Sequence, residues 1–134
     1  MVVGFFGRFV YSDGAWRDDP VADAFLVVDI HDSDIATVEF RSATTAGRFY
    51  LGFQPRDYWE DPDASDPVDA DSEASSFSTW AGEVLGVSVT AEQIRPFLAG
   101  EGVEEPEDAF VEETAVRLIE LLRLPVPDDL RTST

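Results

Sequence analysis

Alternating apolar and polar positions dominate the first half of the chain and indicate strands. Residues 2–11 (VVGFFGRFVY) carry apolar side chains on both alternating faces, which is typical of a strand buried on both sides. Three further runs follow at 25–30 (FLVVDI), 35–41 (IATVEFR) and 48–53 (RFYLGF), separated by short polar turns. Connections this short cannot carry a parallel crossover, so the runs predict an antiparallel meander.

In the second half the apolar spacing lengthens from two to about 3.6 residues and indicates helices. The pattern over residues 72–85 predicts an amphipathic helix that ends at Gly86. Residues 90–100 begin with Thr90 at capping-box spacing, and their internal proline should shorten or kink the helix. A third helix is expected from about residue 106 to residue 124.

Strands that precede helices along the chain predict the α+β class. We expect an antiparallel sheet of about four strands, formed by the N-terminal meander and packed against two or three C-terminal helices. A chain of 134 residues with 44% hydrophobic residues suits one domain with one core. We therefore expect a single domain over residues 1–124 and a C-terminal tail over 125–134.

Charge is the most unusual property of the composition. The chain has 28 acidic and nine basic residues, which gives a formal net charge of -19. This field repels nucleic acid and anionic lipid and speeds encounter with basic partners. Lysine and asparagine are both absent, and both have AT-rich codons, so we expect a GC-rich bacterial genome. Codon bias does not explain the excess of aspartate and glutamate.

Missing residue types exclude several classes of chemistry. Without lysine the chain cannot form a P-loop or a Schiff base, and without cysteine it has no disulfide, thiolate nucleophile or cysteine-bound metal. No apolar run is long enough to span a membrane, and the N-terminus does not resemble a signal peptide. We expect a cytoplasmic protein without a cofactor.

The sole histidine, His31, lies in the sequence DIHDSD among Asp29, Asp32 and Asp34. Nearby carboxylates raise the pKa of a histidine and could complete a metal site. The simpler interpretation is a turn residue between two strands. Metal binding here stays open, and we assign no catalytic residue and no metal ligand.

Residues 60–73 (EDPDASDPVDADSE) form a strongly acidic stretch. Three of its side chains match the first ligand positions of an EF-hand, but Asp66 stands where glycine is needed and Ser72 where a bidentate glutamate is needed. The stretch therefore fails this motif. Two interpretations remain: an exposed, mobile loop, or a face that recognises a basic surface.

Two aromatic residues directly before this stretch favour recognition. Aromatic anchors rimmed by acids are typical of a binding hot spot for a basic surface, although Trp59 could instead fold back onto the sheet edge. The partner-binding residues we predict are Tyr58, Trp59, Glu60, Asp61, Asp63, Asp66, Asp69 and Asp71.

A second acidic cluster precedes and begins the last predicted helix. Its members are Glu101, Glu104, Glu105, Glu107, Asp108, Glu112 and Glu113. Acids at a helix N-terminus complement the helix dipole, which is their simplest role. If both clusters were aligned in one strip, their carboxylates could imitate the phosphates of DNA.

In size, acidity and lack of catalytic signature, the chain is similar to bacterial immunity proteins as a class. We expect a small acidic, non-catalytic protein that sequesters or neutralises a basic protein partner, without direct binding to nucleic acid or membrane. One alternative is a DNA-mimic inhibitor of a nucleic-acid-binding protein. Another is a small-ligand protein or enzyme that uses a cleft between sheet and helices, with His31 and Asp29. Oligomeric state and partner identity stay open.

Overall fold

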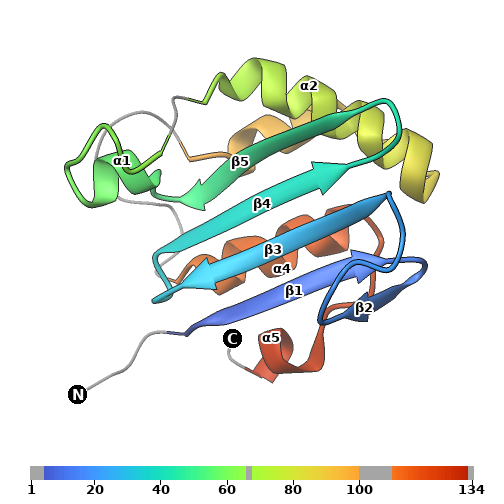
Figure 1. Ribbon diagram of the computed structural model, residues 1–134, viewed down its shortest axis with the longest axis horizontal. Coiled ribbons are helices and arrows are strands. Elements are labelled where there is room, and N and C mark those ends of the chain that lie inside the picture. The colour runs from blue at the N-terminus through green and yellow to red at the C-terminus, as the bar shows by residue number, and fades with distance from the viewer. Residues whose placement is uncertain (1–4, 66–67, 100–109, 133–134) are drawn as a thin grey trace.

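Five antiparallel strands form one sheet in the order β2-β1-β3-β4-β5 (Figure 1). This computed structural model describes residues 5–65, 68–99 and 110–132. The strands are β1 (Gly7–Ser12), β2 (Ala15–Arg17), β3 (Phe25–His31), β4 (Ile35–Arg41) and β5 (Ala46–Gly52). The predicted antiparallel meander is confirmed, with β2 as an additional strand at the edge beside β1.

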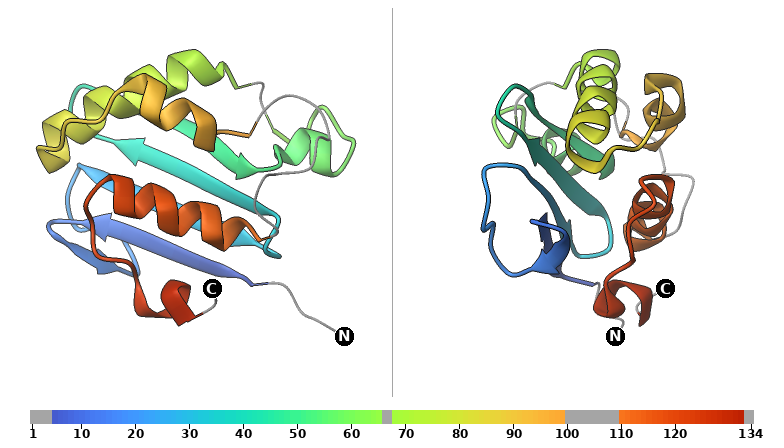
Figure 2. Two further views of the ribbon diagram at one scale, coloured as in Figure 1. Left: turned by 180° about the vertical axis from the view of Figure 1, so that it is seen from behind. Right: turned by 90° about the vertical axis from the view of Figure 1, so that its right-hand side faces the viewer.

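Helices follow the strands in the chain, and the main ones cover a single face of the sheet, as the edge-on view in Figure 2 shows. They are α1 (Pro55–Tyr58), α2 (Ala70–Trp80), the π-helix η1 (Ala81–Leu85), α3 (Ala91–Ile94), the 3-10 helix η2 (Arg95–Phe97), α4 (Val111–Leu121) and α5 (Asp128–Thr132). The predicted α+β class is therefore confirmed. Among the residues in the three described ranges, no helix is long and apolar enough to cross a bilayer.

The core lies between the sheet and α2 and α4. In β4, Ala36, Val38 and Phe40 are buried on the helix side, while Thr37 and Glu39 face the other way, as their alternation predicts. The inward-facing residues of β3, β4 and β5 are paired with one another across the sheet. Their apolar side chains therefore form one continuous surface under the helices. This surface fixes the register, because a slip by one residue would turn every apolar side chain to the wrong face.

Local sequence signals set the helix boundaries. Helix α2 continues directly into η1, and η1 ends at Gly86, which adopts φ 68° as the expected left-handed cap. Thr90 forms the predicted capping box with Gln93, and the turn containing Pro96 is a 3-10 helix, so α3 stops at Ile94. Helix α4 begins at Val111, with Phe110 as its N-cap; residues 106–109 of the predicted helix lie outside the described residues.

Both ends of the chain differ from the expectations. The first described strand begins at Gly7, and residues 5 and 6 run ahead of it without strand pairing. The segment predicted as a C-terminal tail contains α5, and Leu130 is completely buried in the core. The Trp16 indole of β2 donates to the Pro125 carbonyl at 2.6 Å, which attaches this segment to the edge of the sheet.

Candidate functional site

A tight turn joins β3 to β4 at the left-hand end of the sheet in Figure 1. The Asp34 amide donates to the His31 carbonyl at 3.1 Å, and the two central residues, Asp32 and Ser33, have φ values of 51° and 58°. These dihedrals match the twist of the flanking strands but cost residues other than glycine about 1–3 kcal/mol each. Such a turn persists only where its surroundings hold it.

Ser33 provides much of that support, because each of its polar groups is bonded. Its amide donates to the Phe5 carbonyl at 3.0 Å, and its hydroxyl accepts from the Phe5 amide at 2.7 Å. The same hydroxyl donates to the Glu112 carboxylate at 2.9 Å, and the Ser33 carbonyl accepts from the Val111 amide at 2.8 Å. The turn, the start of β1 and the start of α4 are thereby joined into one unit.

Asp34 connects the same turn to β5 and α1. Its carbonyl accepts from the Phe53 amide at 3.3 Å, and its carboxylate accepts from the Tyr58 hydroxyl at 2.8 Å. This hydrogen bond, followed by burial and by the negative charges of Asp34 and Asp32, raises the pKa of Tyr58 above its ordinary value of 10.0. The phenol therefore stays protonated and keeps α1 attached to the turn.

Alkaline titration tests this connection. Because the folded-state pKa of Tyr58 is raised, its contribution to stability is present below the ordinary pKa of 10.0 and is lost as the pH rises through the folded pKa. We expect Asp34→Asn to lower the pKa of Tyr58 more than Asp32→Asn does, because only Asp34 bonds the phenol. Ultraviolet absorbance of tyrosinate, compared with a Tyr58→Phe variant, measures this difference. Equal shifts in both variants would contradict it.

Aromatic rings surround the turn on its outer side. The His31 ring lies between two others, with ring centroids 5.1 Å from Phe6 and 5.3 Å from Trp59. Trp59 also meets the Tyr58 ring at 5.1 Å. Phe6 and Trp59 are 57% and 51% exposed. We call Phe6, His31 and Trp59 the aromatic platform.

Exposed aromatic side chains are concentrated at this end of the molecule. Phe110, which is 48% exposed, directly precedes Val111 and so also adjoins the turn through the bond from Val111 to Ser33. Among the described residues the fourth large exposed apolar side chain is Val21. It belongs to the connection between β2 and β3, at the opposite end of the sheet in Figure 1. Exposed apolar side chains that gather in one region of a surface commonly mark interaction sites.

The structure divides the residues predicted for partner binding. Tyr58 is half-buried, and the side chains that follow it, Trp59, Glu60, Asp61 and Asp63, are exposed around α1 and the next turn. Asp66 lies outside the described residues. The last two predicted members, Asp69 and Asp71, belong to the start of α2.

These two aspartates are already engaged. Asp69 is the N-cap of α2 and accepts from the Ser72 amide at 3.1 Å. Asp71 pairs with Arg95 at 3.0 Å. The acidic stretch is therefore not one uniform loop: its last part is helical, and the part nearest Trp59 provides the exposed carboxylates that are not held by a helix.

Glu112 corrects the interpretation of the second acidic cluster. It lies in the first turn of α4, as predicted, but is only 3% exposed, because this turn packs directly against the β3–β4 turn. One carboxylate oxygen accepts from Ser33, and the other has no hydrogen-bond partner. The cluster members at 101–108 lie outside the described residues. Glu112 therefore cannot contribute to a DNA-like strip.

The unpartnered oxygen predicts the effect of Glu112→Gln. The amide retains an acceptor for Ser33 and removes a buried negative charge, whose desolvation costs more than that of the neutral NH2 group that replaces the unpartnered oxygen. We expect the variant to be more stable than the parent by about 1 kcal/mol near neutral pH, as measured by urea unfolding. Glu112→Ala, which also leaves the Ser33 hydroxyl without its acceptor, should be less stable than Glu112→Gln. The reverse order would contradict this assignment.

No metal site is built around His31 among the residues that the structure describes. There, no three histidine or acidic side chains converge in a way that could hold an ion. The His31 ring is instead packed edge-on between Phe6 and Trp59. His31 therefore lies at the turn between two strands, as the simpler interpretation expects. Its ring also supports two exposed aromatic rings.

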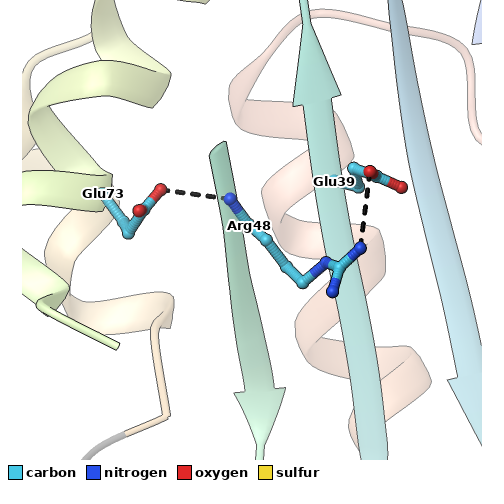
Figure 3. Close-up of polar contacts among 3 residues, drawn as sticks. All are labelled: Glu39, Arg48 and Glu73. Carbon is cyan, nitrogen blue, oxygen red and sulfur yellow. Dashed lines mark hydrogen bonds and ion pairs between the residues drawn. The ribbon is translucent and has the colours of Figure 1, made fainter. Parts of the chain in front are cut away.

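A separate hollow of about 650 Å³ opens along the edge of β5. Figure 3 shows Arg48 at this edge: its amide donates to Glu73 at 3.1 Å, and its guanidinium lies 3.5 Å from Glu39. Burial raises the pKa of Glu73, which the hydrogen bond from the Arg48 amide partly offsets. The described residues that line the hollow include Arg41 and Asp63 but neither His31 nor Asp29. This hollow therefore does not include the histidine and aspartate predicted for a cleft between sheet and helices.

Comparison with known proteins does not assign a family. The chain matches no protein-family model, no curated protein and no solved structure. The functional interpretation therefore depends on the geometry around the β3–β4 turn.

Proposed function

We propose that this protein is a small acidic, non-catalytic binding protein that sequesters or neutralises a basic protein partner in the cytoplasm. The observation that supports this proposal is the gathering of exposed Phe6, Trp59 and Phe110 around one hydrogen-bonded turn. The chain that carries this surface has a net charge of -19. Bacterial immunity proteins, which neutralise toxins, are the analogy for such a role.

Aromatic side chains and carboxylates have different roles in this interaction. Large aromatic residues in the centre of an interface supply most of the affinity, because they lose much water-exposed surface on binding. Charged residues around them mainly speed encounter and select partners of opposite charge. Trp59 followed by Glu60 and Asp61, all exposed, provides both kinds of group in adjacent positions.

Rigid support favours tight binding at this surface. The β3–β4 turn is held by the bonds of Ser33 and Asp34, so the rings packed around it need little ordering when a partner arrives. Preorganisation of this kind lowers the entropic cost of association. We assign His31 no catalytic role here, because its ring supports Phe6 and Trp59.

Affinity capture from the native lysate, followed by mass spectrometry, tests the proposal. The full chain should retain a protein with a net positive charge. Trp59→Ala should weaken retention by at least about tenfold, since hot-spot truncation costs about 2 kcal/mol. The matched control is Val21→Ala, which alters the exposed apolar side chain at the other end of the sheet and should retain the partner fully.

Two results would overturn the proposal. The first is capture that depends on net charge alone, so that the Trp59→Ala and Val21→Ala baits retain the same proteins equally. The second is capture of an acidic or neutral protein that depends on Trp59. In that case the surface would still be a binding site, but its partner would not be basic.

A further inference from the structure

We propose that the aromatic platform binds an arginine side chain of the partner, with the guanidinium stacked on the Trp59 indole and facing nearby carboxylates. This inference rests on the proposed function and names the chemical group that the surface recognises. It concerns Phe6, His31 and Trp59, whose ring contacts join the residue before β1, the end of β3 and the residue after α1.

Trp59 is exposed, and no ring of a described residue stacks parallel on its indole. Half of the residue is exposed, and its two ring neighbours, Tyr58 and His31, meet it at interplanar angles of 90° and 64°. Neither neighbour therefore lies parallel on the indole. A flat cation can attach to an aromatic face through the ring quadrupole, and tryptophan is the best ring for this contact.

The indole N–H of Trp59 is also unoccupied, unlike those of the other tryptophans. Trp16 donates to the Pro125 carbonyl at 2.6 Å and Trp80 to the Arg41 carbonyl at 2.8 Å. In the part of the chain that the structure describes, the Trp59 N–H makes no hydrogen bond. Its exposed position and free donor make it a specific spectroscopic reporter for this surface.

Acidic residues adjoin the platform along the chain. Asp32 follows His31 in the turn, and Glu60 follows Trp59; no described residue pairs with either carboxylate. Asp34 accepts from Tyr58, whose ring contacts that of Trp59. A cation at the indole would therefore meet negative charge from the turn and from the segment after α1.

Two arginines of this chain come near the platform along the sequence: Arg56 in α1, three residues before Trp59, and Arg8 in β1. Arg8 opposes Asp29 in the sheet register, two residues before His31. Its guanidinium donates to the Asp18 carbonyl at 2.7 Å and lies 3.6 Å from the Asp19 carboxylate. These contacts hold Arg8 on the connection between β2 and β3, away from the platform.

The geometry favours arginine over lysine. A guanidinium is planar and weakly hydrated, so it stacks on rings while its N–H groups bond carboxylates in the same plane. An ammonium is a compact, strongly hydrated charge that gains less from a half-exposed ring. The flat indole, with acidic residues adjoining the platform in sequence, therefore suits the planar cation better.

NMR titration of the full 15N-labelled chain with N-acetylarginine amide tests this inference. We expect saturable shifts at the Trp59 indole N–H and at the His31 and Asp32 amides. Trp59→Ala should weaken the binding reported by those two amides by roughly three- to thirtyfold, the range of a cation–π contact. Val21→Ala should leave it unchanged. N-acetyllysine amide at equal ionic strength should bind more weakly.

Each other outcome has a definite meaning. Absent shifts at Trp59, shifts spread evenly over the acidic surface, or equal binding of the lysine compound would overturn the arginine inference. If Trp59-dependent capture of a basic protein persists in that case, the proposed function stands without this inference. If arginine binds at Trp59 but the lysate provides no basic partner, the proposed function fails and the cation site remains.

Discussion

Replacing Phe6 and Trp59 together with alanine is expected to weaken the complex with the basic partner by roughly 3–5 kcal/mol, about a hundredfold to several thousandfold. Both rings are more than half exposed, and both contact His31, so the double variant removes the two accessible sides of the aromatic platform. Calorimetric titration of the captured partner into each variant measures the effect.

Stability separates this loss of binding from a loss of fold. Truncation of exposed side chains usually changes the free energy of unfolding by about 0.5 kcal/mol. We therefore expect the double variant to unfold at nearly the same urea concentration as the parent. The single variants Phe6→Ala and Trp59→Ala complete a double-mutant cycle. Their effects on affinity should not be additive, because both rings contact His31. Unchanged affinity in the double variant would remove the platform from the interface.

The second large effect is expected for Gly52→Ala, which should destabilise the protein by roughly 2–5 kcal/mol. Gly52 has φ 77°, a conformation that costs alanine about 1–2 kcal/mol. A methyl group there would also overlap the Asp34 carbonyl and approach Val111, and such overpacking adds about 1–3 kcal/mol. Since the crowded carbonyl belongs to the β3–β4 turn, partner affinity should fall as well. Urea unfolding and titration measure the two effects.

Gly14 supplies the matched control for this substitution. Its φ is 81°, yet a methyl group placed on it would meet no atom within 4 Å. Gly14→Ala should therefore cost only the backbone term, about 1–2 kcal/mol, and leave affinity unchanged. Equal destabilisation of the two variants would show that contact with the Asp34 carbonyl is unimportant.

Local patterns predicted most of the fold because each element carries its own period. The alternation in β4 and the helical spacing in α4 correspond to faces that are buried in the structure. Strand β2 was missed because three residues are too few to show a period. Helix α5 was also missed. It is short, and its described contact with the core is made by Leu130, which packs against residues that are distant in sequence.

The site was less predictable, since it joins segments that are distant in sequence. Trp59 was singled out because aromatic and acidic residues adjoin it, a signal that is local. Phe6 was assigned to a strand face, and nothing in its neighbours indicates contact with His31. Ser33 and Glu112 are 79 positions apart, so their hydrogen bond has no local signature. The number of acidic residues can be read from the sequence, but which carboxylates are buried depends on the tertiary structure.

The bond from Val111 to Ser33 has a consequence for biosynthesis. The turn between β3 and β4 is synthesised before the backbone amide of Val111 that completes its support, because Val111 lies far later along the chain. A nascent chain therefore carries the acidic segment and Trp59 long before it carries a finished platform. A partner that recognises the platform would bind completed molecules, and isolated fragments of the acidic segment would compete poorly with them.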